Sequence, residues 1–170
     1  MIAPELTALE ALGIAIRSEI DAQELYKELA DKCNNELFKE KLLILHKEEK
    51  KHQTILENLH TQLFSEVELK IPPTETIKKK VFGEAKKPEK ITDILKYAID
   101  LERKSKEFYL DCAELVQDLS GKRMFRYLAD MEFNHQMILT NELEMLEKYP
   151  AYFDQVIPFE VEQSFVRRKE

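Results

Sequence analysis

The two halves of this chain carry the same four residues in the same order, at a constant separation of 83 positions. The matched residues are Glu19 and Glu102, Tyr26 and Tyr109, Glu49 and Glu132, and His52 and His135. A Glu three positions before a His arises readily by chance in a chain with 35% charged residues, but four matches in one register do not. We interpret them as an internal duplication, so both halves should form the same local structure.

Apolar residues recur around these positions in steps of three and four, which predicts one buried face on each of four helices. Pro4 and Glu5 suit the first turn of the first helix, and Asn34-Asn35 ends it and caps the next. The second helix should span roughly 36–63, the third should run from a cap at 92–93 to an end at 120–121, and the fourth should end at Pro150.

The connections predict how these helices are arranged. A tight turn after the first helix requires an antiparallel hairpin, whereas residues 66–91 are long enough to cross over and let the second hairpin pair with the first. We therefore expect an all-α fold, an antiparallel four-helix bundle over residues 1–148. Residues 149–170 are rich in aromatic side chains, and we expect this C-terminal extension to pack on the bundle or on a partner subunit.

Charge and composition exclude several classes of function. The net charge of −7 argues against a nucleic-acid partner, and no apolar run reaches the ~18 residues of a membrane span. The N-terminus lacks the pattern of a secretory signal. Cys33 and Cys112 form no Cys-x-x-Cys pair, which favours reduced thiols, and we expect a cytoplasmic protein.

Six ionisable residues lie in the middle of the predicted apolar faces, at one level of the bundle: Glu19, Glu49, His52, Glu102, Glu132 and His135. Burying four carboxylates without compensation costs several kcal/mol for each unpaired ion. Two divalent cations would balance the four negative charges, and imidazole nitrogens suit iron, manganese or zinc. The pattern therefore predicts a dinuclear metal site.

Through these residues and the two matched tyrosines, roughly residues 5–148 resemble the rubrerythrin and ferritin-like di-iron carboxylate family. The resemblance implies a ferritin-like bundle that holds two iron ions, with manganese or a mixed pair as alternatives. By it, Glu19 and His52 are terminal ligands of one metal and Glu102 and His135 of the other. Glu49 and Glu132 are implied to bridge the two metals.

The same resemblance implies a non-haem oxidoreductase that reduces peroxide or O₂, with a role in oxidative stress and a separate electron donor. We also expect a homodimer or a higher homo-oligomer. Tyr26 and Tyr109 are the candidate catalytic residues, because each lies two turns after a proposed ligand on the same face. There a phenol can hydrogen-bond a ligand or lie near the oxygen pocket, although simple packing in the bundle is the alternative.

The chain departs from the family pattern in two respects. Ser105 stands where rubrerythrins usually carry a further Glu, and no paired Cys-x-x-Cys knuckles of a rubredoxin domain are present. Two other functions therefore remain open: a ferroxidase or iron-handling protein, and a non-catalytic binding module stabilised by metal.

A helical interaction protein with solvated carboxylates is a further alternative to these metal-site readings. His46 and His60 lie off the ligand face and are expected at the surface or near helix ends. Glu24 and Glu107 should be solvated, and Lys106 should extend outward.

Overall fold

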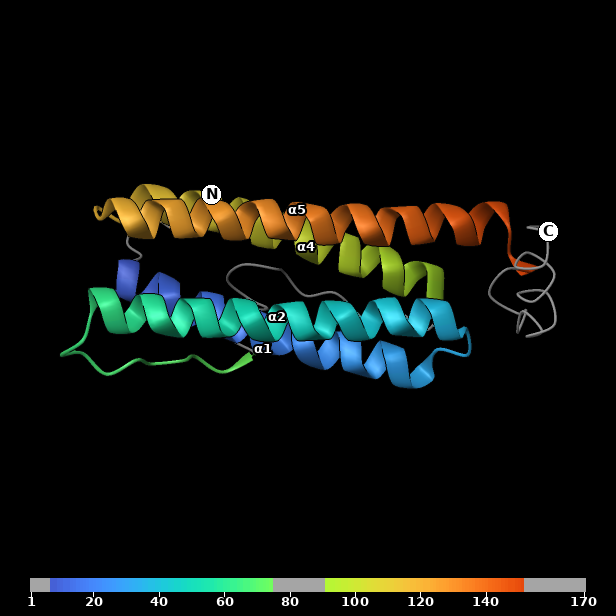
Figure 1. Ribbon diagram of the computed structural model, residues 1–170, viewed down its shortest axis with the longest axis horizontal. Helices are drawn as coiled ribbons and strands as arrows, with labels where there is room; N and C mark the ends of the chain where they lie inside the picture. The colour runs from blue at the N-terminus through green and yellow to red at the C-terminus, as the bar shows by residue number, and fades with distance from the viewer. Residues whose placement is uncertain (1–6, 75–90, 152–170) are drawn as a thin grey trace, which may run out of the picture.

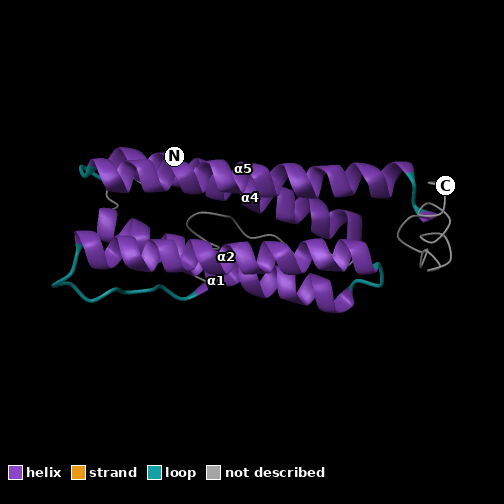
Figure 2. Ribbon diagram, in the orientation of Figure 1, coloured by secondary structure: helices purple, strands orange, loops and turns teal. Residues whose placement is uncertain are grey.

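The computed structural model describes residues 7–74 and 91–151 and contains four long helices in these ranges (Figure 1). They are α1 (Ala8–Lys32), α2 (Glu36–Leu63), α4 (Ile91–Leu115) and α5 (Leu119–Lys148). No strand occurs among the described residues (Figure 2). The predicted all-α four-helix bundle is confirmed.

Packing is closest within each hairpin, where α1 lies on α2 and α4 lies on α5. The hairpins then meet through α1 with α4 and α2 with α5. The apolar core forms two clusters, one around Leu56 and Phe125 and the other around Phe38 and Leu139. A polar level therefore separates two apolar halves of the bundle.

Capping residues explain where the first hairpin's helices begin. Thr7 caps α1 in a capping box with Glu10, whereas Pro4 and Glu5 lie outside the described residues. Asn35 caps α2, as predicted, and its side chain accepts a hydrogen bond of 2.9 Å from the backbone N–H of Phe38.

The predicted boundaries of the second hairpin require correction. Helix α4 begins at Ile91, so residues 92–93 lie in its first turn instead of preceding it. It ends at Leu115, and Asp118 caps α5 by accepting a 2.7 Å hydrogen bond from the Gly121 N–H. Residues 120–121 therefore lie in the first turn of the fourth helix and do not end the third, because the Asp118 carboxylate accepts a backbone N–H that has no partner within the helix.

The described part of the crossover packs along α1 (Figure 1). A Cβ atom on Gly13 would overlap the carbonyl oxygen of Lys70, so only glycine permits this close approach. The Arg17 Nε donates a 2.9 Å hydrogen bond to the Pro72 carbonyl, and the Thr74 hydroxyl donates one of 2.9 Å to Asp21. Hydrogen bonds therefore hold the described part of the crossover against α1 as far as Thr74.

Residues 75–90 of the predicted connector and 152–170 of the predicted extension lie outside the described residues. The division at residue 148 thus stays a prediction. Within 7–74 and 91–151, no helix combines the length and apolar character that crossing a bilayer demands.

Candidate metal centre

The structure brings together all six predicted site residues at the level between the two apolar clusters. Each helix contributes through its buried face, and each of the six residues is between 0 and 3% exposed. They are Glu19 from α1, Glu49 and His52 from α2, Glu102 from α4, and Glu132 and His135 from α5. Both hairpins are therefore needed to build the cluster.

Glu49 spans the two histidines. Its Oε2 lies 3.0 Å from the Nδ1 of His52, and its Oε1 lies 3.0 Å from the Nδ1 of His135. The two imidazole rings are stacked, with centroids 5.2 Å apart and planes inclined by 13°. One carboxylate thus presents one oxygen to each imidazole.

The remaining carboxylates surround this centre. The Oε1 of Glu132 lies 3.0 Å from the Nδ1 of His52. Glu19 approaches the same nitrogen with Oε2 at 3.6 Å, and Glu102 approaches the Nδ1 of His135 with Oε2 at 3.7 Å. Each histidine therefore has one outer carboxylate of its own, as the duplication requires.

The two tyrosines bind the outer carboxylates from the opposite hairpin. The Tyr26 hydroxyl, on α1, donates to Oε1 of Glu102 on α4, and the Tyr109 hydroxyl, on α4, donates to Oε1 of Glu19 on α1. Both tyrosines are fully buried. Each hydroxyl occupies one carboxylate oxygen and leaves the other directed at the cluster.

The cluster contains several buried polar atoms that have no hydrogen-bond partner among the described residues. They are both oxygens of Glu49, both ring nitrogens of His52 and of His135, Oε2 of Glu102 and Oε1 of Glu132. One ligand atom each from Glu49, His52, Glu132 and His135 lie within 4.8 Å of one another. Buried polar groups are normally satisfied, so close but poorly aligned donors and acceptors fit a site built for cations.

Burial and mutual charge shift the pKa values in this cluster. Burial raises the pKa of Glu19 and of Glu132 well above the usual range, and the charge of Glu49 raises it further. Burial alone would lower the pKa of His135, but the carboxylates of Glu102 and Glu49 raise it to about 10.

The two other perturbed groups complete this pattern. Burial would lower the pKa of His52, but Glu132, Glu19 and Glu49 raise it. Burial would raise the pKa of Glu49, yet His135 and His52 hold it below its usual range. Without metal the cluster therefore binds protons, which a cation has to displace.

Other predicted positions lie away from the cluster. His46 is half-buried and its Nδ1 lies 2.9 Å from the Gln23 carbonyl oxygen, which joins α2 to α1. Glu24 and Glu107 are exposed, as expected. The ammonium of Lys106 lies 4.5 Å from the ring centroid of Phe133, which is an exposed side chain.

Two buried ionisable residues were not predicted to be buried. His60 was expected at the surface or near a helix end. It does lie in the last turn of α2, but it is buried, with its ring centroid 6.1 Å from that of Phe64. Glu142 is buried on α5 and forms an ion pair with Lys41 of α2. Its position, in step with Leu139 and Leu146, is the signal that could have identified it.

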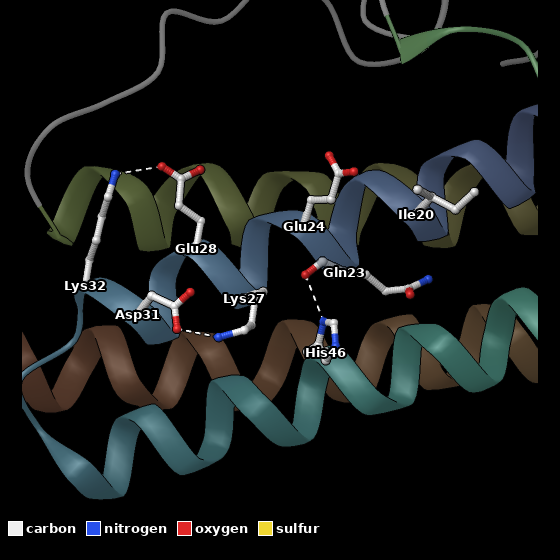
Figure 3. A pocket seen from close by; sticks show the side chains of 8 residues that line it. All are labelled: Ile20, Gln23, Glu24, Lys27, Glu28, Asp31, Lys32 and His46. Carbon is white, nitrogen blue, oxygen red and sulfur yellow. Dashed lines mark hydrogen bonds and ion pairs between the residues drawn. The ribbon is translucent and has the colours of Figure 1, made fainter.

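A hollow on the outer side of α1 is separate from this centre (Figure 3). It is lined by Ile20, Gln23, Glu24, Lys27, Glu28, Asp31, Lys32 and His46, none of which belongs to the cluster. Lys27 pairs with Asp31, and Lys32 binds Glu28 at 2.6 Å. Two of the three carboxylates that line the hollow are therefore paired with lysines of α1, unlike the carboxylates of the buried centre.

A four-helix bundle that gathers buried Glu and His side chains from two duplicated hairpins defines the ferritin-like class of metal-carboxylate proteins. The rubrerythrin family model matches residues 10–143, which include part or all of each helix. The chain belongs to the rubrerythrin family.

A solved structure of a hypothetical protein from Pyrococcus furiosus is similar to this chain, with 38% sequence identity and a TM-score of 0.72. The match covers 85% of this chain and 93% of the Pyrococcus chain. A search of curated proteins gives no significant match.

Proposed function

We propose that this protein is a non-haem di-iron oxidoreductase of the rubrerythrin type, which reduces peroxide or O₂. The observation that carries the proposal is the position of Glu49, with one carboxylate oxygen 3.0 Å from each of two histidine nitrogens. This arrangement supports two metal positions that share Glu49. The proposed ligands are Glu19, His52, Glu102 and His135 at the outer positions, with Glu49 and Glu132 between the metals.

The donor set supports iron or manganese in preference to calcium or magnesium. Calcium and magnesium favour oxygen ligands, whereas the two imidazoles supply nitrogen. Two divalent cations would also cancel the charge of four carboxylates. We propose iron as the metal, because a pair of ferrous ions can supply two electrons to one oxidant.

The surrounding residues position the carboxylates and exclude water. Tyr26 and Tyr109 fix one oxygen of Glu102 and Glu19, so the second oxygen keeps its direction toward the cluster. The apolar clusters on either side restrict solvent. Reduction of one peroxide to two waters consumes two electrons and two protons, and we propose that a separate donor protein or small reductant returns the electrons.

Ferroxidase activity is a second candidate, because Ser105 replaces the additional Glu that is usual in rubrerythrins. Ser105 is half-buried on α4, one turn after Glu102, and its short hydroxyl side chain supplies no carboxylate for ligand exchange. A site without that exchange could oxidise iron and release it as product.

Rapid mixing of the reduced, iron-loaded protein with peroxide tests the proposal. We expect about two ferrous ions to be oxidised per peroxide consumed, with the iron retained on the chain and reducible for another cycle. Glu102→Gln should abolish this turnover, whereas the matched control Glu107→Gln, an exposed carboxylate on the same helix, should preserve it. Release of ferric mineral without repeated peroxide turnover would favour the ferroxidase and contradict the peroxidase.

A further inference from the structure

Helices α2 and α5 lie side by side, and α5 finishes at the end of the bundle where α2 begins (Figure 1). Near that end both helices carry large apolar side chains that are exposed. These side chains are each between 38 and 59% exposed: Leu37, Ile44, Ile138, Met145 and Tyr149. We call this set the α2/α5 patch. Soluble proteins rarely leave so many neighbouring apolar side chains uncovered without a binding role.

An ion pair shows that the two rows of the α2/α5 patch face one another. Lys41 of α2 pairs with Glu142 of α5 across the helix interface. Leu37 and Ile44 lie four residues before and three after Lys41, so they share its side of α2. Ile138 lies four residues before Glu142, and Met145 and Tyr149 lie three and seven residues after it. These three residues therefore share its side of α5.

The duplication accounts for only part of the α2/α5 patch. A shift of 83 residues relates its five members to Ser120, Tyr127, Ile55, Gln62 and Glu66. Ser120, Gln62 and Glu66 are polar and exposed, whereas Tyr127 is an exposed aromatic residue and Ile55 a half-buried apolar one. The equivalent surface at the opposite end of α2 and α5 is therefore more polar, and the wholly apolar set lies at the end from which the chain continues past α5.

Residues 152–170 have the position, length and chemistry to cover this surface. They follow Tyr149 of the α2/α5 patch by three residues, and they include Phe153, Phe159 and Phe165. The patch extends along α5 for about 16 Å from Tyr149 back to Ile138, at ~1.5 Å per residue. An extended chain spans about 3.3 Å per residue, so roughly five residues reach its far end.

We propose that residues 152–170 bind the α2/α5 patch of their own chain. The aromatic side chains would cover the apolar rows on both sides of the Lys41–Glu142 pair, removing this area from water. Binding of this segment would also shield the half-exposed Lys41 side chain, whose exposed fraction is 44%. It would join the two hairpins on the outside of the bundle, in addition to the buried cluster inside.

Photo-crosslinking of the full-length protein tests this proposal. p-Benzoylphenylalanine replaces Ile44 in one variant and Leu110, an exposed apolar residue of α4, in the control. After irradiation, peptide mapping should place most crosslinks from position 44 within residues 152–170, with few from position 110. An equal mixture of ¹⁴N- and ¹⁵N-labelled chains should give crosslinked peptides of one isotope only.

Three results would overturn the proposal. Crosslinks from position 44 to the helices of a second copy would identify a dimer interface. Mixed-isotope crosslinks to residues 152–170 would show that the segment covers a neighbouring chain. Equal labelling of these residues from positions 44 and 110 would show no specific docking.

Discussion

Tyr26 and Tyr109 each hold a carboxylate that belongs to the other hairpin. Because the hydroxyl binds Oε1 of its partner, Oε2 of Glu102 and of Glu19 remains 3.6 to 3.7 Å from a histidine Nδ1. Outer residues of this kind fix the orientation of a metal ligand before the metal arrives. We therefore propose that the tyrosines are positioning residues for these two carboxylates.

Removing these hydroxyls should weaken metal binding with little effect on the fold. Tyr26→Phe or Tyr109→Phe preserves the ring and frees one oxygen of the outer carboxylate. We expect each variant to lose about 10- to 100-fold in metal affinity, measured by competition with a chromogenic chelator. The control Tyr127→Phe changes an exposed ring on α5 and should leave affinity unchanged. Equal affinity in all three variants would exclude the positioning role.

At the scale of the elements, Gly13 determines how the crossover packs. The Lys70 carbonyl occupies the space where a side chain at position 13 would begin, and the Arg17 and Thr74 hydrogen bonds hold the same segment. Glycine inside a helix costs about 1 kcal/mol relative to alanine. The close packing of the crossover against α1 offsets that cost.

Gly13→Ala should therefore destabilise the protein although it improves helix propensity. The new methyl group must displace backbone, and we expect a net loss of about 1 to 3 kcal/mol in the free energy of unfolding. Urea denaturation followed by circular dichroism measures it. Gly121→Ala is the comparison, because its methyl would meet side-chain carbons, Val116 Cγ1 at 2.7 Å and Leu63 Cδ1 at 3.3 Å, instead of a backbone carbonyl. A stabilised Gly13→Ala protein would contradict this packing.

At the scale of the whole molecule, the buried cluster should make the metal-free protein sensitive to pH. The pKa of His135 rises from 6.5 in the unfolded chain to about 10 in the fold, and the pKa values of Glu19, Glu132 and His52 are also raised. Each of these groups binds its proton more tightly in the folded state. The histidine contribution to stability is therefore complete below pH 6.5 and disappears as the pH rises toward 10.

We accordingly expect the Tm of the metal-free protein to fall between pH 6.5 and 10, measured by calorimetry. Glu49 has a lowered pKa and is ionised in both states across this window, so it does not change the direction. Metal-loaded protein should show a smaller fall, because cations replace the protons. A metal-free Tm that rises across the window would contradict the assigned shifts.

Much of this architecture could be predicted from periodicity and from the repeat. The apolar steps located α2, and the shift of 83 residues selected the six cluster residues from many other charged ones. Spacing along one helix could not show that Tyr26 binds Glu102, because that contact depends on how α1 packs on α4. The close contact between Gly13 and the Lys70 carbonyl could not be predicted either, because a single glycine in a helical pattern does not indicate which residue packs against it.

We expect the buried cluster to hold two metal ions, and the metal content of the purified protein measures this. Anaerobic titration with ferrous iron, removal of unbound metal and elemental analysis should give about two irons per chain. Glu49→Gln alters the carboxylate that both histidines share and should lower this number, while the exposed Glu24→Gln should not. A correctly folded protein that binds no iron, manganese or zinc under these conditions would show that the cluster is not a metal site.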